Sequence, residues 1–329
     1  MPPNLDIVIV DYNAGALIQR CLESLRAHVP SHVNLNRIVV VDNASNPPTE
    51  IPALSGELRV VLLRNEHNQG FAKACNQGAA LCSSEYLLLL NPDTELLANS
   101  LDLPVLFLEN PANARYGLVS IQLLGDDGKV SQTCSEHPRV RHFVAKAFGL
   151  DRVAPTRMPT GVLSGWDHAE SREVEGLIGA FFLVRRDVWD QLQGFDERFF
   201  VYFEEAEFGY RASKAGMHSF FLSTAQARHQ GGGTTDAIRA TRLYFSLQSR
   251  LRYAKKHFGP LDRLVVLLLT AVIEPGTRLL FDLVRRDWRG FGDTARGVLL
   301  LWRWLILHDE GPARRRTSLH APIPMEINP

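Results

Sequence analysis

Four consecutive leucines at residues 87–90 constrain the fold of this chain more than any other feature. Tyr86 precedes them and Asn91-Pro92-Asp93 follows them. A short apolar run bounded by turn residues predicts a strand that is buried on both faces, as in the middle of a parallel sheet. Because Pro92 has no N–H to donate, the strand ends there and Asp93 follows at the carboxyl edge of the sheet. Ligands bind at that edge, and a carboxylate there can hold a divalent cation; an ordinary turn with a solvated Asp93 is the equally weighted alternative.

Three earlier segments predict further strands of the same sheet. They lie at residues 5–10, 37–41 and 58–63, and helices are predicted after the first of them and at 71–82. Strands and helices that alternate at this spacing indicate βαβ units. Each strand ends in Asp, Asn or Gly, and although one such cluster would be a simple turn, four at one sheet edge predict a nucleotide pocket.

Composition and motifs exclude several classes of protein. The chain has no G-x-G-x-x-G after its first strand and no P-loop sequence, which disfavours a dinucleotide site and a P-loop site. Lys+Arg and Asp+Glu both number 36, so the formal net charge is zero and we expect no nucleic-acid partner. Four cysteines without paired spacing, no export signal and no apolar run of eighteen residues predict a reduced, cytoplasmic chain without a spanning helix.

The predicted elements after residue 100 alternate less regularly than those before it. A helix is predicted at 101–108, a strand at 115–121, a long functional loop or cover at 134–173, a single strand at 174–184 and a short helix at 185–192. A segment rich in aromatic residues, 199–203, then leads into a helix with an acidic first turn, which the helix dipole favours whatever the function. Glu207 can pair with Arg211 one turn later, so a structural role for Glu207 is as well supported as a catalytic one.

A histidine and three glycines follow the next predicted strand, at 218–222. A lone histidine after a strand is usually structural, but Gly231, Gly232 and Gly233 follow His229 at once. Glycines allow a close backbone approach, and their N–H groups can cradle anionic oxygens. A long helix is predicted at 236–257.

Six motifs in this order, between Leu5 and Thr235, resemble the bacterial family 2 glycosyltransferases and more narrowly their rhamnosyltransferase-like branch. They are Val39-Val-Val-Asp42-Asn43-Ala-Ser45, Asn68-Gln-Gly70-Phe71-Ala72 with Asn76 and Gly78, Leu89-Leu-Asn91-Pro92-Asp93, Gly179-Ala-Phe-Phe-Leu-Val-Arg185, Gly194-Phe195-Asp196-Glu197, and the acidic run that ends at Arg211.

The resemblance implies an α/β GT-A fold, with a mostly parallel central sheet, and an inverting sugar transfer from a nucleotide-diphosphate donor. It implies that Asp42 binds the pyrimidine base. Asp93 matches the metal-binding acid of the family's D-x-D position, Asn91 replaces the first acid, and His229 can complete a site for Mg²⁺ or Mn²⁺. The residues expected to bind the nucleotide sugar are Tyr12, Asn13, Asp42, Asn43, Asn68, Gly70, Phe71, Asn76 and Asn91.

The catalytic base departs from the family pattern. The family's aspartate base falls on Glu205 and its last aspartate on Glu207, and both are glutamates here. The extra methylene moves a carboxylate by about 1.5 Å, enough to slow a reaction badly unless the backbone compensates. Glu205 is therefore the preferred catalytic base, and Glu204 is the alternative base. A third possibility is that the enzyme is only weakly active.

The sequence predicts three regions. They are a catalytic domain at 1–235, with a nucleotide-binding half at 1–95 and an acceptor half at 96–235, a helical region at 236–310, and a disordered tail at 311–329. Apolar segments at 261–273 and 297–307 alternate with arginines. Such helices can lie on an anionic membrane surface, and packing on the catalytic domain or on a second subunit is an equal alternative.

The expected function is transfer of a sugar, with rhamnose as one candidate, to a cell-envelope glycan. The donor would be a dTDP-sugar or a UDP-sugar, and the acceptor a glycan or a lipid-linked glycan. The enzyme would be cytoplasmic, peripheral at the inner face of the cell membrane, and a homo-oligomer is one option. A non-catalytic glycan-binding or scaffold protein of the same fold is the first alternative. A sugar-1-phosphate nucleotidylyltransferase is the second, disfavoured because its glycine-rich basic loop is missing after the first strand.

Overall fold

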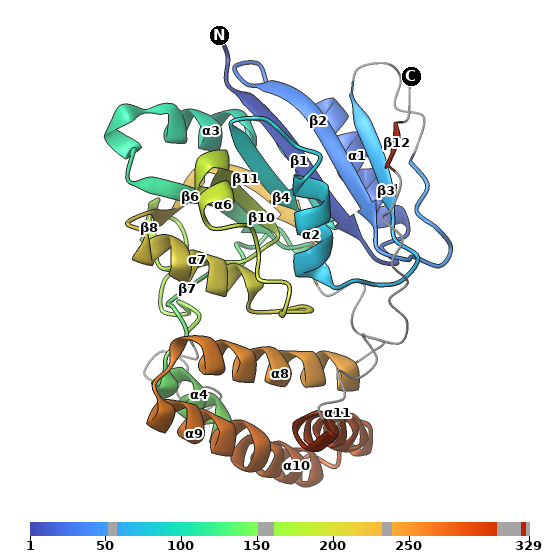
Figure 1. Cartoon of the computed structure of the whole chain (residues 1–329), viewed down its shortest axis with the longest axis vertical. Helices are drawn as coiled ribbons and strands as arrows, with labels where there is room; N and C mark the ends of the chain where they lie inside the picture. Colours follow the sequence, from blue (N-terminus) through green and yellow to red (C-terminus); the bar gives the residue numbers. More distant parts are fainter. Residues whose placement is uncertain (52–57, 151–160, 232–238, 308–323, 327–329) are drawn as a thin grey trace.

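A central sheet flanked by helices forms the upper part of the molecule in Figure 1. The computed structural model describes residues 1–51, 58–150, 161–231, 239–307 and 324–326. The strand order is β12-β3-β2-β1-β4-β10-β6-β11-β5, with β8 on β11, and β7 pairs separately with β9. The strands are β1 (Asn4–Asp11), β2 (Asn34–Asp42), β3 (Val60–Arg64), β4 (Tyr86–Leu90), β5 (Thr94–Leu96), β6 (Tyr116–Leu124), β7 (Cys134–Ser135), β8 (Arg172–Val174), β9 (Gly176–Leu177), β10 (Phe181–Arg185), β11 (His218–His229) and β12 (Pro324–Glu326).

Strands β3, β2, β1 and β4 are parallel neighbours, as the sequence predicts. The register places Asp11 opposite Asp42, so both strands deliver an acidic residue to the same edge. Beyond β4 the sheet is mixed, because β10 runs antiparallel to both β4 and β6. All five residues of β4 are buried, which agrees with the predicted central strand.

Helices cover both faces of the sheet because side chains of each strand alternate between them. Ile7 and Ile9 pack with α1 and α3, whereas Val8 and Val10 pack with α2, α6 and α7. The helices are α1 (Ala16–Ala27), α2 (Phe71–Ala79), α3 (Asp102–Glu109), α4 (Val140–Ala147), α6 (Arg186–Gln191), α7 (Glu204–Lys214), α8 (Arg239–His257), α9 (Pro260–Leu268), α10 (Glu274–Val284) and α11 (Trp288–Leu307), with a 3₁₀ turn η1 (Pro111–Asn113) and a π-helical turn η3 (Leu269–Ile273).

The segment predicted as one strand at 174–184 is broken, and that prediction was wrong. It divides into the end of β8, β9 and β10. At the break, the N–H of Gly179 donates to Glu205 Oε1 over 3.0 Å instead of to a neighbouring strand. The predicted loop at 134–173 is also more ordered than expected, since it contains β7 and α4; its residues 151–160 lie outside the described part of the chain.

Helices α8 to α11 and α4 form a layer below the sheet (Figure 1). An apolar cluster of its own holds this layer together, with Phe143 of α4, Tyr244 and Leu251 of α8 and Leu301 of α11. Buried Arg250 of α8 forms an ion pair with Glu274 of α10.

Helices α9, η3 and α10 form one continuous 25-residue helix, Pro260–Val284. Pro275 cannot donate to the carbonyl of Ala271, and that carbonyl accepts a hydrogen bond from Trp302 Nε1 over 2.8 Å instead. By length and composition this helix is apolar enough to cross a membrane, contrary to the expectation that no helix is. One third of its most apolar stretch is buried against the rest of the molecule.

The predicted disordered tail at 311–329 lies outside the described residues except for β12. This short strand pairs antiparallel with β3 at the edge of the sheet.

Candidate active site

The ends of β1 and β2 meet through Thr49. Its hydroxyl donates to Asp11 Oδ2 over 2.6 Å, and its N–H donates to Asp42 Oδ2 over 3.0 Å. The other Asp42 oxygen accepts from the N–H of Ser45 over 2.8 Å. Both carboxylates are buried, and burial raises the pKa of Asp11 although the bond from Thr49 opposes the shift. Asp42, the predicted base-binding residue, therefore shapes the loop after β2 as well as facing the strand edge.

Tyr12 and Asn13 follow β1 directly. Asn13 joins the loops after β1 and β2, because its N–H donates to Ser45 Oγ over 3.0 Å and its Oδ1 accepts from the N–H of Asn46 over 2.7 Å. Tyr12 is 41% exposed beside these joined loops. The exposed ring is free to stack on a flat ligand.

A network of side-chain amides fixes the loop before α2. Buried Asn43 donates to Asn68 Oδ1 over 3.0 Å and accepts from Asn65 Nδ2 over 3.1 Å and from the N–H of Gln69 over 2.9 Å. Asn68 Oδ1 also accepts from the N–H of Gly70 over 2.9 Å. The structure thus brings Asn43 and Asn68 together, as predicted for one pocket, but uses their amides to hold the loop.

Three other residues that were predicted to bind the nucleotide sugar contact the segment that precedes α7. The N–H of Phe71 donates to the carbonyl of Phe200 over 2.6 Å, and a Cβ on Gly70 would lie 2.5 Å from that same oxygen. Asn76 exchanges hydrogen bonds of 2.9 Å with the N–H and the carbonyl of Phe195. Gly70, Phe71 and Asn76 therefore dock this segment on α2.

Asp93 and His229 lie side by side because β5 pairs with β11, with Thr94 opposite His229. Asp93 Oδ1 is 3.2 Å from His229 Nε2, and each side chain is 14% exposed. Burial would raise the pKa of Asp93, but the hydrogen bond and the charge of His229 outweigh it and hold the pKa below its usual value.

This pair fits a divalent cation. Two ligands at about 2.1 Å from an octahedral ion, at right angles, lie about 3 Å apart. Among the described residues, no third His, Cys, Asp or Glu joins the pair. A cation held here would have its other positions open to phosphate oxygens and water.

Helix α7 presents the adjacent carboxylates Glu204 and Glu205 at its first turn. The two residues before it, Tyr202 and Phe203, have φ of 68° and 73°, a conformation that strains non-glycine residues and often marks functional sites. Glu204 is buried, and its Oε2 has no hydrogen-bond partner among the described residues. Burial raises the pKa of both carboxyl groups, and the charge of Glu205 raises that of Glu204 further.

Of the two residues, Glu205 is half-buried, whereas Glu204 is buried. Its Oε1 accepts from Gly179, and the next residue, Ala180, accepts from the N–H of Asn91 over 3.0 Å. The turn at 179–180 thus connects Glu205 to the Asn91–Asp93 turn. A Cβ on Gly179 would lie only 2.3 Å from Glu205 Oε1, so the glycine makes room for the longer glutamate side chain.

We expect Gly179→Ala to lower kcat by about 100-fold, because a displacement near 1 Å of a reacting group costs about that much. The melting temperature should change little, since the clashing atom is the end of a side chain. The matched control is Gly165→Ala, where a new Cβ meets nothing within 4 Å. Equal kcat for Gly179→Ala and wild type would show that the position of the Glu205 carboxylate does not limit the reaction.

Glu207 has a structural environment. It is fully buried, and its carboxylate pairs with Arg211 at 2.9 Å, with Lys256 at 2.6 Å and with His257 at 3.1 Å. Burial opposes ionisation, yet these hydrogen bonds lower the pKa of Glu207 to about 2. The structure therefore favours the structural role over the catalytic one, and Glu207 joins α7 to α8.

Glu207→Gln should lower the free energy of unfolding by about 3 kcal/mol at pH 7. This figure follows because the pKa of Glu207 in the folded protein, about 2, lies about 2.5 below its ordinary value. Because the pKa is depressed in the folded state, this contribution is complete above about pH 5. It should disappear as the pH falls from about 4.5 to 2. Urea unfolding at several pH values measures the difference, with exposed Glu170→Gln as the control; a difference independent of pH would contradict the assignment.

Sequence reasoning missed several residues that build this site. Thr49 lies 38 residues from Asp11, and Lys256 lies 49 residues from Glu207, so no local motif links either pair. Gly179 was expected only as part of a family motif. The steric contact with Glu205 could not be read from spacing.

The sheet, its helices and the strand-end cluster define the GT-A class of glycosyltransferase folds. The structure aligns with mannosyltransferase PcManGT from Pyrobaculum calidifontis, solved in complex with GDP-Man and Mn²⁺, at a TM-score of 0.54 and 14% identity over 92% of this chain and 88% of that one. It also aligns with GalNAc-T7, solved with UDP, GalNAc and Mn²⁺, at a TM-score of 0.50. The sequence identity is 16%, over 86% of this chain and 57% of that one.

Residues 6–147 match the family described as Glycosyl transferase family 2, which bears out the predicted resemblance to this family and the prediction of a glycosyltransferase. The chain is 26% identical to N-acetylglucosaminyl-diphospho-decaprenol L-rhamnosyltransferase of Mycobacterium tuberculosis, over 78% of this chain and 85% of that protein. It is 24% identical to the low-salt glycan biosynthesis hexosyltransferase Agl10 of Haloferax volcanii, over 86% of each.

Proposed function

We propose that this glycosyltransferase moves a sugar, with inversion, from a nucleoside-diphosphate donor to a hydroxyl of a lipid-linked cell-envelope glycan. The observation that carries the proposal is the Asp93–His229 pair, 3.2 Å apart, next to the turn whose Gly179 N–H holds Glu205. Similarity to a rhamnosyltransferase that is named for a diphospho-decaprenol acceptor supports rhamnose as the sugar and a lipid diphosphate as the acceptor.

Asp93 and His229 would hold Mg²⁺ or Mn²⁺, which offsets the charge that develops on a leaving nucleoside diphosphate. Glu205 accepts the proton of the acceptor hydroxyl as its oxygen bonds to the anomeric carbon. The bond from that carbon to the diphosphate oxygen breaks on the opposite face, so one displacement inverts the configuration without a covalent enzyme intermediate. Tyr12, Asn13 and Asp42 lie where the donor nucleotide would bind.

The match to the glycosyltransferase family favours this reaction over the two alternatives. A nucleotidylyltransferase would need a basic glycine-rich loop after β1, and Asn13 joins that loop to the next one by hydrogen bonds instead. A non-catalytic role was suggested by glutamate in place of aspartate at 205. The space that Gly179 leaves for the longer side chain supports an adapted site.

The test of the function is a transfer assay with dTDP-rhamnose, UDP-sugars and GDP-sugars on a synthetic N-acetylglucosaminyl-diphospho-prenol. We expect turnover with one nucleotide class and, by NMR, a product whose anomeric configuration is opposite to that of the donor. Retention of configuration would contradict the single displacement.

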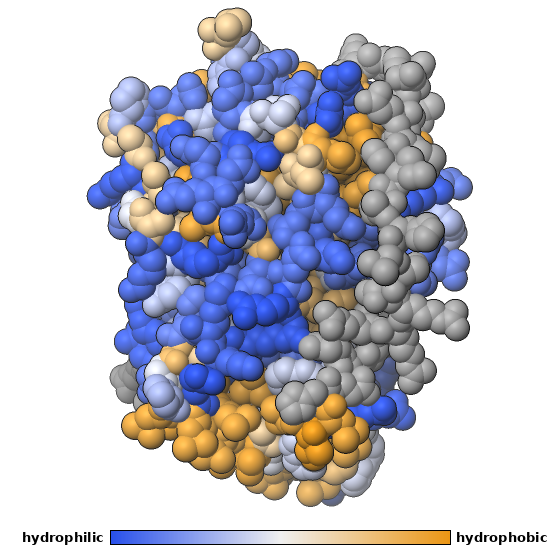
Figure 2. Space-filling model, in the orientation of Figure 1, coloured by the Kyte–Doolittle hydropathy of each residue, from blue (hydrophilic) through white to orange (hydrophobic). Residues whose placement is uncertain are grey.

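We also propose that α9, α10 and α11 rest on the membrane that carries the acceptor. Figure 2 shows apolar side chains gathered over this end of the molecule. Large exposed apolar side chains of these helices include Leu261, Leu264, Leu268, Val272, Leu280, Leu283, Val284, Trp288, Leu299, Trp302, Ile306 and Leu307. Exposed arginines such as Arg285, Arg286 and Arg289 border them, which suits an anionic surface.

Wild-type protein should sediment with phosphatidylglycerol vesicles, and Leu268→Glu/Leu280→Glu should bind them at least about tenfold more weakly. These two side chains are 52% and 61% exposed, so the melting temperature should not change, while each buried leucine contributes about 1.5–3 kcal/mol to membrane binding. Leu106→Glu, at an exposed site on α3, is the matched control. Wild-type protein that stays in the supernatant would contradict this orientation.

A further inference from the structure

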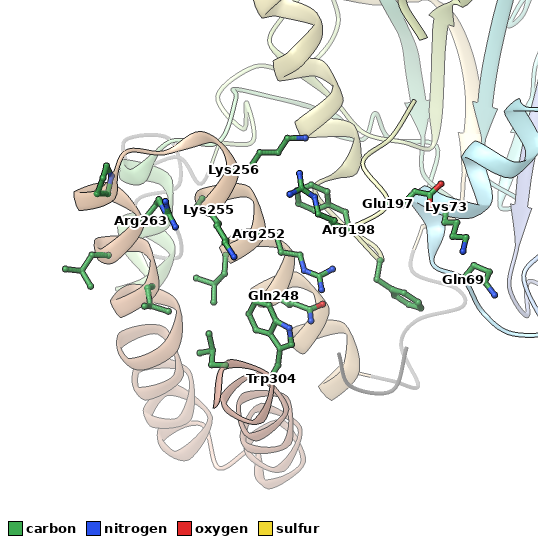
Figure 3. Close-up of a pocket in the computed structure, with 18 residues that line it drawn as sticks. Gln69, Lys73, Glu197, Arg198, Gln248, Arg252, Lys255, Lys256, Arg263 and Trp304 are labelled. Carbon is green, nitrogen blue, oxygen red and sulfur yellow. The ribbon is translucent and has the colours of Figure 1, made fainter. Parts of the chain in front are cut away.

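A cavity of about 1080 Å³ lies between the catalytic part and the helical layer, and none of the predicted donor, metal or base residues lines it (Figure 3). Side chains from α2, from residues 197–200, from α8, from α9 and from α11 form its walls. Gln69 and Phe200 belong to the wall that borders the loop before α2. The cavity is therefore adjacent to the proposed donor site without being part of it.

The cavity is strongly basic on one side. Six of its side chains are cationic and one, Glu197, is acidic. The cations are Lys73, Arg198, Arg252, Lys255, Lys256 and Arg263. Asp196 pairs with Arg198 and with Lys256, each at 2.6 Å, which offsets part of this charge.

Three of the cations have no such partner. Among the described residues, no side-chain hydrogen bond or ion pair engages Lys73, Lys255 or Arg263. Lys255 of α8 and Arg263 of α9 lie at one end of the cavity, whereas Lys73 of α2 lies at the other end beside Glu197 (Figure 3). Lys255 and Arg263 repel each other, so an anion with several charged oxygens would stabilise their arrangement.

Part of the cavity wall is apolar. Leu264 and Leu267 of α9 and Trp304 and Leu305 of α11 line it. Leu264 is 51% exposed and also belongs to the apolar end of the molecule described above. The apolar wall is thus continuous with the surface that we place on the membrane. A ligand of this cavity would have a multiply charged anionic head and a long hydrocarbon chain.

We propose that this cavity binds the diphosphate and the first isoprene units of the acceptor lipid. This inference rests on the proposed function for the identity of the acceptor. Lys255 and Arg263 contact the diphosphate, and the α9 and α11 side chains contact the chain as it leaves toward the membrane. Held here, the lipid presents its sugar from the side of Phe200, whose carbonyl accepts a 2.6 Å hydrogen bond from Phe71 at the start of α2.

The direct test is calorimetric titration of the full-length protein with farnesyl diphosphate, a soluble isoprenoid diphosphate, in EDTA so that no cation links it to Asp93 and His229. We expect binding that is at least about tenfold tighter than that of inorganic pyrophosphate, farnesol or dihexanoyl-phosphatidylglycerol. Lys255→Ala/Arg263→Ala should weaken it by about tenfold or more, because each bond to a charged oxygen is worth a large part of that factor. Arg26→Ala, which alters an exposed arginine of α1 outside the cavity, should bind like wild type.

Two results would overturn the proposal. If the double variant and wild type bound farnesyl diphosphate with equal affinity, the cavity would not be the binding site. Binding of phosphatidylglycerol as tight as that of farnesyl diphosphate would make it a headgroup site of the bilayer. Stabilisation by nucleoside diphosphate with Mn²⁺ is measured on the same variants. If nucleoside diphosphate with Mn²⁺ does not stabilise wild type, the donor site is refuted. If it does stabilise wild type but farnesyl diphosphate does not bind, only the acceptor-lipid site is refuted.

Discussion

Glu205→Gln should lower kcat by about 10²- to 10⁴-fold, the usual contribution of a general base, and leave nucleotide binding unchanged. Glutamine keeps the size of the side chain and can still accept the Gly179 N–H bond, so the turn at 179–180 should hold its shape. What the substitution removes is a carboxylate whose pKa burial has raised, and with it the ability to take a proton from the acceptor. Release of nucleoside diphosphate under saturating donor and acceptor measures the effect.

Two controls separate this role from simple damage. Exposed Glu170→Gln should be fully active. Glu204→Gln should retain more activity than Glu205→Gln, because Glu204 is fully buried whereas Glu205 is half-buried. A Glu205→Gln enzyme with wild-type kcat would move the base assignment to Glu204 or remove it altogether.

Asp93→Asn should lower kcat/KM by at least about 10²-fold, which corresponds to several kcal/mol of lost charge stabilisation. The amide keeps a neutral oxygen near His229 but loses the negative charge that attracts a divalent cation. Activity should therefore require much more Mn²⁺ than in wild type, and the dependence on Mn²⁺ concentration is the decisive readout.

Asp127→Asn is the matched control, since Asp127 is an exposed residue paired only with Lys129 among the described side chains. His229→Gln should show the same change in Mn²⁺ dependence with a smaller loss. If Asp93→Asn kept the wild-type Mn²⁺ dependence, the cation would bind elsewhere or play no part.

The sheet core could be predicted because it depends on short-range patterns. Apolar runs such as residues 87–90 determine which strands are buried, and the register of parallel strands then brings Asp11 and Asp42 to one edge. Asp93 and His229 were expected together from the family motifs, and pairing of β5 with β11 accounts for their contact.

Other parts of the site depend on contacts that no local pattern contains. Glu207 has the spacing of a helix pair with Arg211, but its burial under Lys256 and His257 depends on how α8 packs on α7. The break of the strand at Gly179 depends on a carboxylate 26 residues later. The apolar, arginine-rich helices gave no sign that α2, α8, α9 and α11 enclose a basic cavity.

The most direct test of the central claim is thermal unfolding with dTDP, UDP or GDP, each with and without Mn²⁺, for wild type and Asp93→Asn. A ligand at about one hundred times its Kd adds roughly 2.7 kcal/mol to the free energy of unfolding, so a clear rise in melting temperature is measurable. We predict a rise for wild type with one nucleotide that requires Mn²⁺, and no such rise for Asp93→Asn. The absence of a rise with every nucleotide in wild type would contradict a metal-dependent nucleotide site at this sheet edge.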